Sequence, residues 1–102
     1  GGAKLGDIIP SGSMKKEDGK SALPGKWQIL NAGEVTLTVS GKVVTSVEKA
    51  FGNRGLIAEI DESEELLGLH VSMGGFPIKA WLNQDGAKID LVFSNGGRWT
   101  KL

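Results

Sequence analysis

Turn-forming residues recur along most of this chain at short, nearly regular intervals, and this spacing constrains its fold more than any other feature. From residue 25 onward, groups of Gly, Asn, Asp and Ser separate runs of five to ten residues. The runs span 26–31, 34–40, 42–51, 55–61, 65–73, 76–83, 87–94 and 98–102. Each has the length of a β-strand, and the connections are too short for the crossovers that parallel strands require. The spacing predicts eight antiparallel strands.

Apolar and polar residues alternate within several of these runs. In residues 34–40, Val, Leu and Val alternate with Thr, Thr and Ser, and residues 88–94 repeat the pattern with Ile, Leu and Phe. A period of two turns one face of a strand toward a core. Closing the meander into an up-and-down barrel also removes both sheet edges. We therefore expect an all-β, eight-stranded antiparallel barrel with at most a small internal pocket, or a β-sandwich as the alternative.

Residues 1–24 differ from the rest of the chain. They are rich in Gly and Ser, carry a run of mixed charge at 15–18, and contain apolar residues too scattered to order the backbone. We expect a flexible arm over residues 1–24, followed by a single barrel domain over residues 25–102. Ser11-Gly12-Ser13-Met14 resembles a cloning junction followed by a start methionine, which would make residues 1–13 expression-derived.

Charge and composition exclude several classes of function. Twelve basic and twelve acidic residues cancel, so we expect no nucleic-acid partner. No apolar run reaches the length of a membrane span, and the signal-peptide order of residue types is absent. We expect a soluble protein, either cytosolic or, after removal of a leader, secreted or periplasmic. The absence of Cys excludes disulfides, thiolate metal sites and thiol nucleophiles.

Few residues in the sequence suggest catalytic or metal chemistry. His70 is the only histidine, and alternation places it on the surface. Five carboxylates between Glu59 and Glu65 lack the spacing of a known calcium loop and are best explained as a solvated turn. The Gly-rich stretches 52–55 and 95–98 open no predicted helix, so they are turns and not phosphate-binding loops. The sequence predicts no catalytic residue, no metal and no cofactor.

Two features at the ends of the predicted barrel suggest a family. Gly25-Lys26-Trp27 opens the first strand, and Arg98 lies in the last. In these features the chain resembles the calycins, which include lipocalins, avidins and small bacterial metalloproteinase inhibitors. The resemblance implies that Arg98 packs over the indole of Trp27 and closes the barrel, with both residues structural. The chain departs from these families in being shorter than lipocalins and in lacking the inhibitors' disulfide.

The remaining tryptophans are the candidate binding residues. Alternation turns Trp81 outward beside Lys79, and Trp99 could lie near it at one rim, although both could instead be packing residues. The first hypothesis is a non-catalytic, inhibitor-type module that binds another protein such as a hydrolase, in part through an extended segment at 15–24. The alternative is a carrier of a small apolar ligand, held at the barrel mouth against Trp81, Trp99 and Met73.

Overall fold

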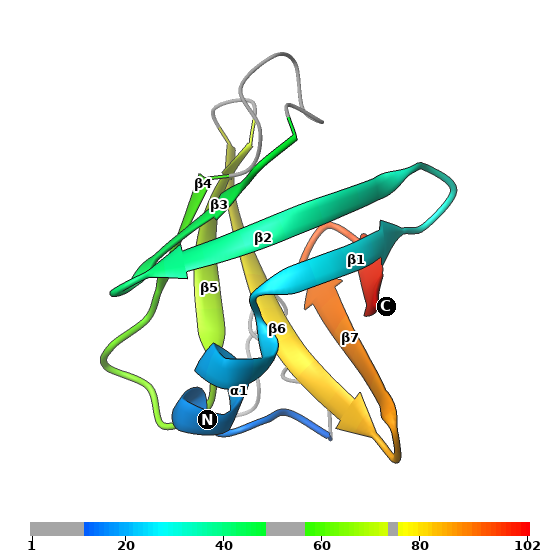
Figure 1. Cartoon of the computed structure of the whole chain (residues 1–102). Helices are drawn as coiled ribbons and strands as arrows, with labels where there is room; N and C mark the ends of the chain where they lie inside the picture. The colour runs from blue at the N-terminus through cyan, green and yellow to red at the C-terminus, as the bar shows by residue number, and fades with distance from the viewer. Residues whose placement is uncertain (1–11, 49–56, 74–75) are drawn as a thin grey trace.

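Eight strands follow one another in sequence order around a closed barrel in the computed structural model, which describes residues 12–48, 57–73 and 76–102 (Figure 1). Each strand is antiparallel to both of its neighbours. The elements are α1 (Lys16–Ala22), β1 (Gly25–Ile29), β2 (Glu34–Ser40), β3 (Val43–Ser46), β4 (Ile57–Ile60), β5 (Gly68–Met73), β6 (Phe76–Asp85), β7 (Lys88–Phe93) and β8 (Arg98–Lys101).

The first and last strands close the barrel. β1 pairs with β8 through Trp27↔Lys101, Gln28↔Thr100 and Ile29↔Trp99. The predicted fold, an all-β, eight-stranded antiparallel barrel, is thereby confirmed. Every predicted run overlaps one observed strand, and β3 and β4 flank residues 49–56, which lie outside the described part of the chain.

Inward-facing residues of all eight strands form one hydrophobic core. The alternation read from the sequence holds, because the apolar members of each strand are buried and pack together. The fully buried side chains with the largest volumes are those of Leu23, Trp27, Val35, Leu37, Val44, Leu67, Leu69, Val71, Leu82 and Leu91. The interior along these strands is thus occupied by side chains, as expected for a small barrel.

Residues 12–24 are packed against the barrel, in contrast to the flexible arm expected from the sequence. The amide of Met14 donates to the carbonyl of Leu82 at 2.9 Å, and the carbonyl of Met14 accepts from the amide of Leu67 at 2.8 Å. Two further backbone bonds hold residues 12 and 16. This stretch, Gly12–Lys16, which we call the wedge segment, lies between the chain leading into β5 and the end of β6. Backbone hydrogen bonds order this segment, and amino-acid composition cannot predict such bonds. Residues 1–11 lie outside the described part.

The short helix α1 was also not predicted. A central Gly lowers the intrinsic helix propensity of KEDGKSA by about 1 kcal/mol relative to Ala, so tertiary contacts must stabilise it. Gly19 is buried against the barrel, where an added Cβ would lie 2.7 Å from the Cβ of Leu67. Leu23, which follows the helix, is fully buried in the core. α1 therefore covers the end of the barrel at which β5 begins (Figure 1).

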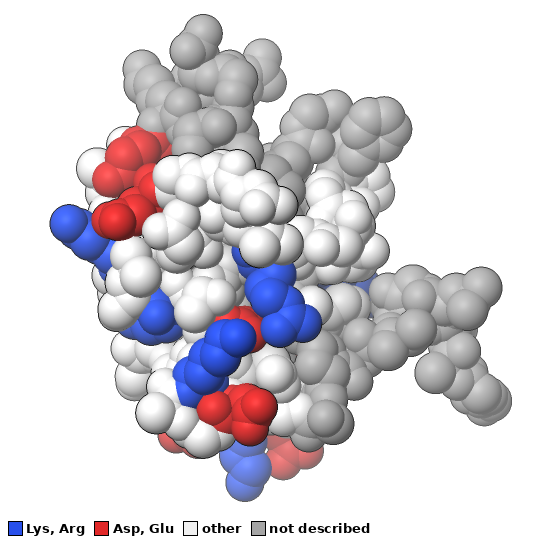
Figure 2. Space-filling view, turned by 90° about the vertical axis from the view of Figure 1, so that its right-hand side faces the viewer, with Lys and Arg blue, Asp and Glu red and all other residues white. Residues whose placement is uncertain are grey.

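Charged side chains are mixed in sign on the outer surface. On the side that includes β7 and β8, basic and acidic groups are interspersed, with no large area of one sign (Figure 2). Lys88 and Arg98 both lie within 4 Å of the Asp90 carboxylate, at 3.8 and 3.0 Å. Within the described ranges, no helix has the length and apolarity needed to cross a bilayer.

Candidate functional site

The cation that covers Trp27 at the end of the barrel is Lys101 and not Arg98. The ammonium of Lys101 lies 5.2 Å from the centre of the Trp27 ring, and it also donates to the carbonyls of Ala22 and Pro24. The indole N–H of Trp27 donates to the carbonyl of Leu23 at 2.9 Å. Burial lowers the pKa of Lys101 from its ordinary value, because desolvation disfavours the charged form. The cation expected from the resemblance is present in the last strand, three residues after the predicted one.

The side chain of Arg98 instead lies on the outer face of the barrel. It donates to the carboxylate of Asp90 at 3.0 Å, and its side chain is half exposed. Since neighbouring residues of a strand point to opposite faces, Arg98 cannot share a face with its neighbour Trp99, which is in the core. Lys101 is in register with Trp27 across the β1–β8 pair, which is why it can cover the indole.

The two candidate binding tryptophans lie on opposite faces of the barrel wall. Trp99 is 3% exposed and packs in the core, where its ring centre lies 4.9 Å from that of Phe93. Trp81 lies on the outer face with Lys79, as alternation predicts. The structure therefore does not bring Trp81 and Trp99 together at one rim. The side chain of Met73, the third residue proposed for a ligand at the barrel mouth, lies outside the described part.

Trp81 is almost buried although it is on the outer face. It is 8% exposed and is not a member of the core cluster. Its partner in the β5–β6 register is Gly68, where an added Cβ would lie 3.8 Å from the Cδ1 and Nε1 atoms of the indole. The missing side chain at Gly68 leaves one edge of the indole uncovered. A glycine inside a predicted strand is a sequence signal for such close approach.

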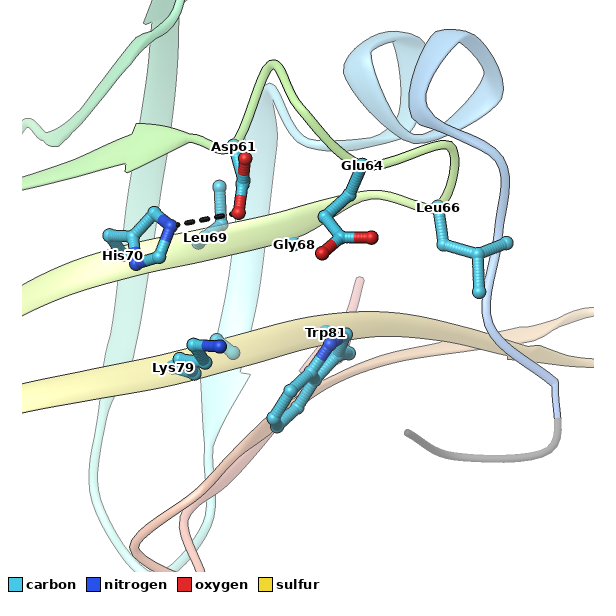
Figure 3. Close-up of a pocket in the computed structure, with 9 residues that line it drawn as sticks. Asp61, Glu64, Leu66, Gly68, Leu69, His70, Lys79 and Trp81 are labelled. Atoms are coloured by element: carbon cyan, nitrogen blue, oxygen red, sulfur yellow. Dashed lines mark hydrogen bonds and ion pairs between the residues drawn. The ribbon is translucent and has the colours of Figure 1, made fainter. Parts of the chain in front are cut away.

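A small pocket opens over this edge of Trp81 (Figure 3). It has a volume of about 170 Å³ and lies on the outer wall between β5, β6 and the loop that joins β4 to β5. Its lining combines the apolar side chains of Leu66 and Trp81 with four ionisable ones, Asp61, Glu64, His70 and Lys79. Part of the acidic stretch that the sequence suggested was a solvated turn therefore lines a pocket. We call this site the outer-wall pocket.

Asp61 is the best-anchored polar residue of the pocket. The hydroxyl and amide of Ser63 donate to one carboxylate oxygen at 2.5 and 2.9 Å, and Nε2 of His70 lies 3.0 Å from the other. The hydrogen bonds from Ser63, followed by that of His70, lower the pKa of Asp61 to about 2. Asp61 is thus ionised and fixes both the start of the loop and one side of the His70 ring.

These three residues are of the types found in hydrolase triads but are connected in a different order. In a triad the imidazole lies between the hydroxyl and the carboxylate, so that it can remove the hydroxyl proton. Here the carboxylate of Asp61 lies between Ser63 and His70. The Ser63 hydroxyl donates to a carboxylate and is not activated by an imidazole.

A wider groove continues from the pocket along the same wall. It has a volume of about 450 Å³ and shares His70 and Lys79 with the pocket. Its other lining residues include Ser72, Pro77 and Ser94. His70 and Lys79 face each other in the β5–β6 register, so they lie at the junction of the two hollows. Pocket and groove therefore lie next to each other along the outer wall.

Within the part of the chain that the structure describes, no three His, Asp or Glu residues come close enough to hold a metal ion. The acidic stretch divides its charges among different partners. Glu62 lies 3.7 Å from Lys16 and 3.6 Å from Lys20, whereas Glu59 lies 3.8 Å from Lys42. Glu62 thus attaches the loop to α1, whereas Glu59 on β4 pairs with Lys42 in the turn before β3, so these carboxylates do not converge on one point.

No protein-family model, curated protein or solved structure matches this chain. Its likeness to calycins consequently rests on architecture, namely a closed barrel of eight antiparallel strands. The outer-wall pocket has to be interpreted from its own chemistry.

Proposed function

We propose that this chain is a non-catalytic binding protein that holds a segment of another protein against the outer wall formed by β5 and β6. The observation that carries the proposal is the pair of adjacent hollows, the outer-wall pocket and the groove, whose linings share His70 and Lys79. Two adjacent hollows with an almost buried tryptophan in one of them suit a peptide segment, since aromatic anchors in pockets dominate protein interfaces.

The packing of the interior favours an external site over a ligand held inside the barrel. Leu23 and Trp27 are fully buried at the end covered by α1, and the described inward side chains contact one another as one cluster. Of the three residues expected to hold a small apolar ligand, Trp81 faces away from the interior and Trp99 is consumed by core packing. Two of the three residues behind the apolar-carrier hypothesis are therefore unavailable to a ligand inside the barrel, and the side chain of Met73 lies outside the described part.

The external site also replaces the inhibitor mechanism expected from the sequence. In that mechanism residues 15–24 would lie as an extended peptide in the cleft of a partner. Seven of these residues form α1, and the carbonyls of Ala22 and Pro24 are bound by Lys101. Releasing them would break the contacts that cover the barrel end. A partner therefore meets a rigid wall rather than a flexible arm.

The order of contacts around Asp61 and the mixed charge of the surface support the remaining parts of the proposal. The Ser63 hydroxyl lacks an imidazole base, which favours binding over nucleophilic catalysis. The side shown in Figure 2 carries interspersed charges, which favours a protein over a polyanion as partner. The covering of Trp27 by a cation of the last strand is in keeping with membership of the calycins, which we propose on this ground.

Selection of random peptides on the immobilised full chain tests the proposal. Peptides that bind the wild type are tested against Ser72→Arg, which places a long cation in the groove, and against Thr38→Arg on β2, an exposed position away from it. We expect Ser72→Arg to weaken binding at least tenfold and Thr38→Arg to leave it unchanged.

Peptides that bind both variants equally, or the failure of selection to yield any peptide, would contradict the proposal. Saturable quenching of tryptophan fluorescence by apolar ligands that is unaffected by Ser72→Arg would instead favour a ligand inside the barrel.

A further inference from the structure

Two polar groups in the outer-wall pocket have no partner within the described residues. One is the indole N–H of Trp81, which makes no hydrogen bond there although its side chain is more than nine-tenths buried. The nitrogen atom itself remains in contact with solvent. The other is the carboxylate of Glu64, which extends over Gly68 toward the nitrogen edge of the indole (Figure 3).

Asp61 and the Nε2 atom of His70, which also line the pocket, are already engaged with each other. Both oxygens of Asp61 are bound, one by Ser63 and the other by His70. Lys79 also takes part in a further interaction. A molecule that enters over Gly68 thus meets an unpaired donor, Trp81 Nε1–H, and an unpaired acceptor, the Glu64 carboxylate (Figure 3).

To pair with both groups, a ligand must accept one hydrogen bond and donate another. A Lys or Arg side chain carries donors only and would leave the indole N–H unpaired. A carboxylate carries acceptors only and would face the charge of Glu64. A carboxamide has a carbonyl oxygen and an NH₂ group on one planar unit, so it can satisfy both without a net charge. Burying a polar group without a hydrogen-bond partner is unfavourable, so the carboxamide, which pairs both groups, fits the pocket better than the cation or the carboxylate.

We propose that the outer-wall pocket binds the side-chain carboxamide of a Gln or Asn residue of the partner segment. Its carbonyl oxygen accepts from Trp81 Nε1–H, and its NH₂ group donates to Glu64. The methylene groups of the side chain pack on Leu66 and the indole. This inference rests on the proposed function, and it adds the residue type that the wall recognises.

The size and depth of the pocket favour a side chain over a peptide main chain. The volume of about 170 Å³ is below the roughly 300–1,000 Å³ of sites for drug-sized ligands. The donor is also recessed, because 8% of Trp81 is exposed. A projecting side chain can reach it, whereas the amides of a main chain are held off by their own flanking residues.

The test follows the indole ¹⁵N–¹H signals of the full chain by NMR. Trp81→Phe identifies the Trp81 signal by its loss. The probes are the N-acetyl N′-methylamides of Gln, Met, Glu and Lys, which share a main chain without a primary carboxamide and differ in the side chain. We expect the Gln probe alone to shift the Trp81 signal downfield saturably. The Trp27 signal should not move, because its N–H is bonded to the carbonyl of Leu23 at 2.9 Å.

Three variants locate the site. Gly68→Ala adds a methyl group 3.8 Å from Trp81 Nε1, an ordinary contact that should not disturb the fold, and should weaken the Gln probe at least fivefold by covering the donor. Glu64→Ala should weaken it roughly tenfold, the effect of a hydrogen bond to a charged group. Glu59→Ala, an exposed carboxylate outside the pocket, should have no effect.

A Trp81 signal that does not move up to the solubility limit of the Gln probe, or that moves equally with the Glu, Lys or Met probe, would overturn the proposal. The selected peptides separate this failure from that of the proposed function. Peptides that bind the wall but carry no Gln or Asn, together with an unmoved Trp81 signal, would leave protein binding in place and remove the carboxamide.

Discussion

Lys101 performs two tasks at a single position. Its ammonium covers the face of Trp27, and it binds two carbonyls at the C-terminal end of α1, where cations are favoured by the helix dipole. The long stem crosses from the last strand to the segment before the first. One side chain thereby joins β8 to α1 and to Trp27 of β1, both of which lie more than seventy residues earlier in the sequence.

Replacing Lys101 should therefore destabilise the fold more than replacing an exposed lysine. We expect Lys101→Met to lower the free energy of unfolding by about 1–3 kcal/mol, since two carbonyls lose a charged donor. Lys42→Met removes a 3.8 Å surface ion pair with Glu59 and should change it by less than about 0.5 kcal/mol. Urea unfolding followed by fluorescence gives both values, and equal effects would contradict the role assigned to Lys101.

Asp61 makes stability depend on pH in the acidic range. Its pKa in the folded state, about 2, is below the ordinary value of 3.8, so the folded state favours the ionised form. The resulting stabilisation is fully present above about pH 4 and is lost as the pH falls toward 2. Ser63→Ala removes the largest cause of the shift and should raise the pKa of Asp61, as measured by its carboxyl ¹³C signal. An unchanged midpoint would show that the Ser63 amide and His70 hold the carboxylate without the hydroxyl.

At the scale of elements, the barrel wall is completed by a segment that is not part of the meander. The wedge segment bonds to the end of β6 on one side and to the chain entering β5 on the other. β5 and β6 pair directly only from Gly68↔Trp81 onward, so the wedge fills the place where they separate. Leu66, which pairs with Lys15 of the wedge segment, also lines the outer-wall pocket, so the wedge segment borders the pocket.

Proline substitutions should distinguish the bonded amide of Met14 from the unbonded amide of Lys15 in the wedge segment. Met14→Pro removes the amide that donates to Leu82 and should destabilise the fold by about 1–3 kcal/mol. Lys15→Pro should be nearly neutral, because Lys15 has φ of −65° and its amide has no backbone partner among the described residues. Hydrogen exchange at Leu67, whose amide donates to Met14, should accelerate in the first variant and not in the second.

The contact between α1 and the barrel sets helix propensity against packing. Gly19→Ala would favour the helix by about 1 kcal/mol on propensity alone. The added Cβ would lie 2.7 and 2.8 Å from the Cβ and Cδ2 of Leu67, and overpacking of this kind costs about 1–3 kcal/mol. We expect net destabilisation in thermal unfolding. Ser21→Ala, exposed on the same helix, should be neutral or stabilising, and a more stable Gly19→Ala would show that the helix can move away.

Viewed as a whole molecule, the barrel depends on contacts that are distant in sequence. Pairing of β1 with β8 joins residues seventy or more positions apart, and no contact within a hairpin can replace it. Folds dominated by such contacts reach the native state in milliseconds to seconds. Stopped-flow refolding monitored by Trp27 and Trp99, both in the core, should show a phase on this scale. Complete recovery within microseconds would mean that the core forms before closure.

The architecture could be predicted from the sequence because its signals are local. Turn residues and alternation in stretches such as 34–40 and 88–93 define both the strands and their inward faces. The register that brings Lys101 rather than Arg98 onto Trp27 depends on barrel closure and has no local signal. The same is true of α1 and the wedge segment, whose order comes from Leu67 and from backbone bonds.

The outer-wall pocket was predicted only in part. Alternation correctly placed Trp81, Lys79 and His70 on the outer face, but it treats every outward residue as exposed. Trp81 is instead nearly buried, and the absence of a Cβ at Gly68 leaves one edge of its indole open. The acidic stretch likewise contained both anchoring carboxylates, such as Glu62, and the unpaired Glu64, and only the fold separates their roles.

The position of the wedge segment has a mechanical consequence. A tensile load applied at the N-terminal side of residue 12 reaches the few backbone bonds of the wedge before it reaches any bond between barrel strands. The protein should therefore unfold in two stages under load. The wedge segment first detaches from β6 with a short extension, and the barrel strands then separate at higher force. A partner anchored next to the wedge would be released in the first stage, while the barrel stays intact.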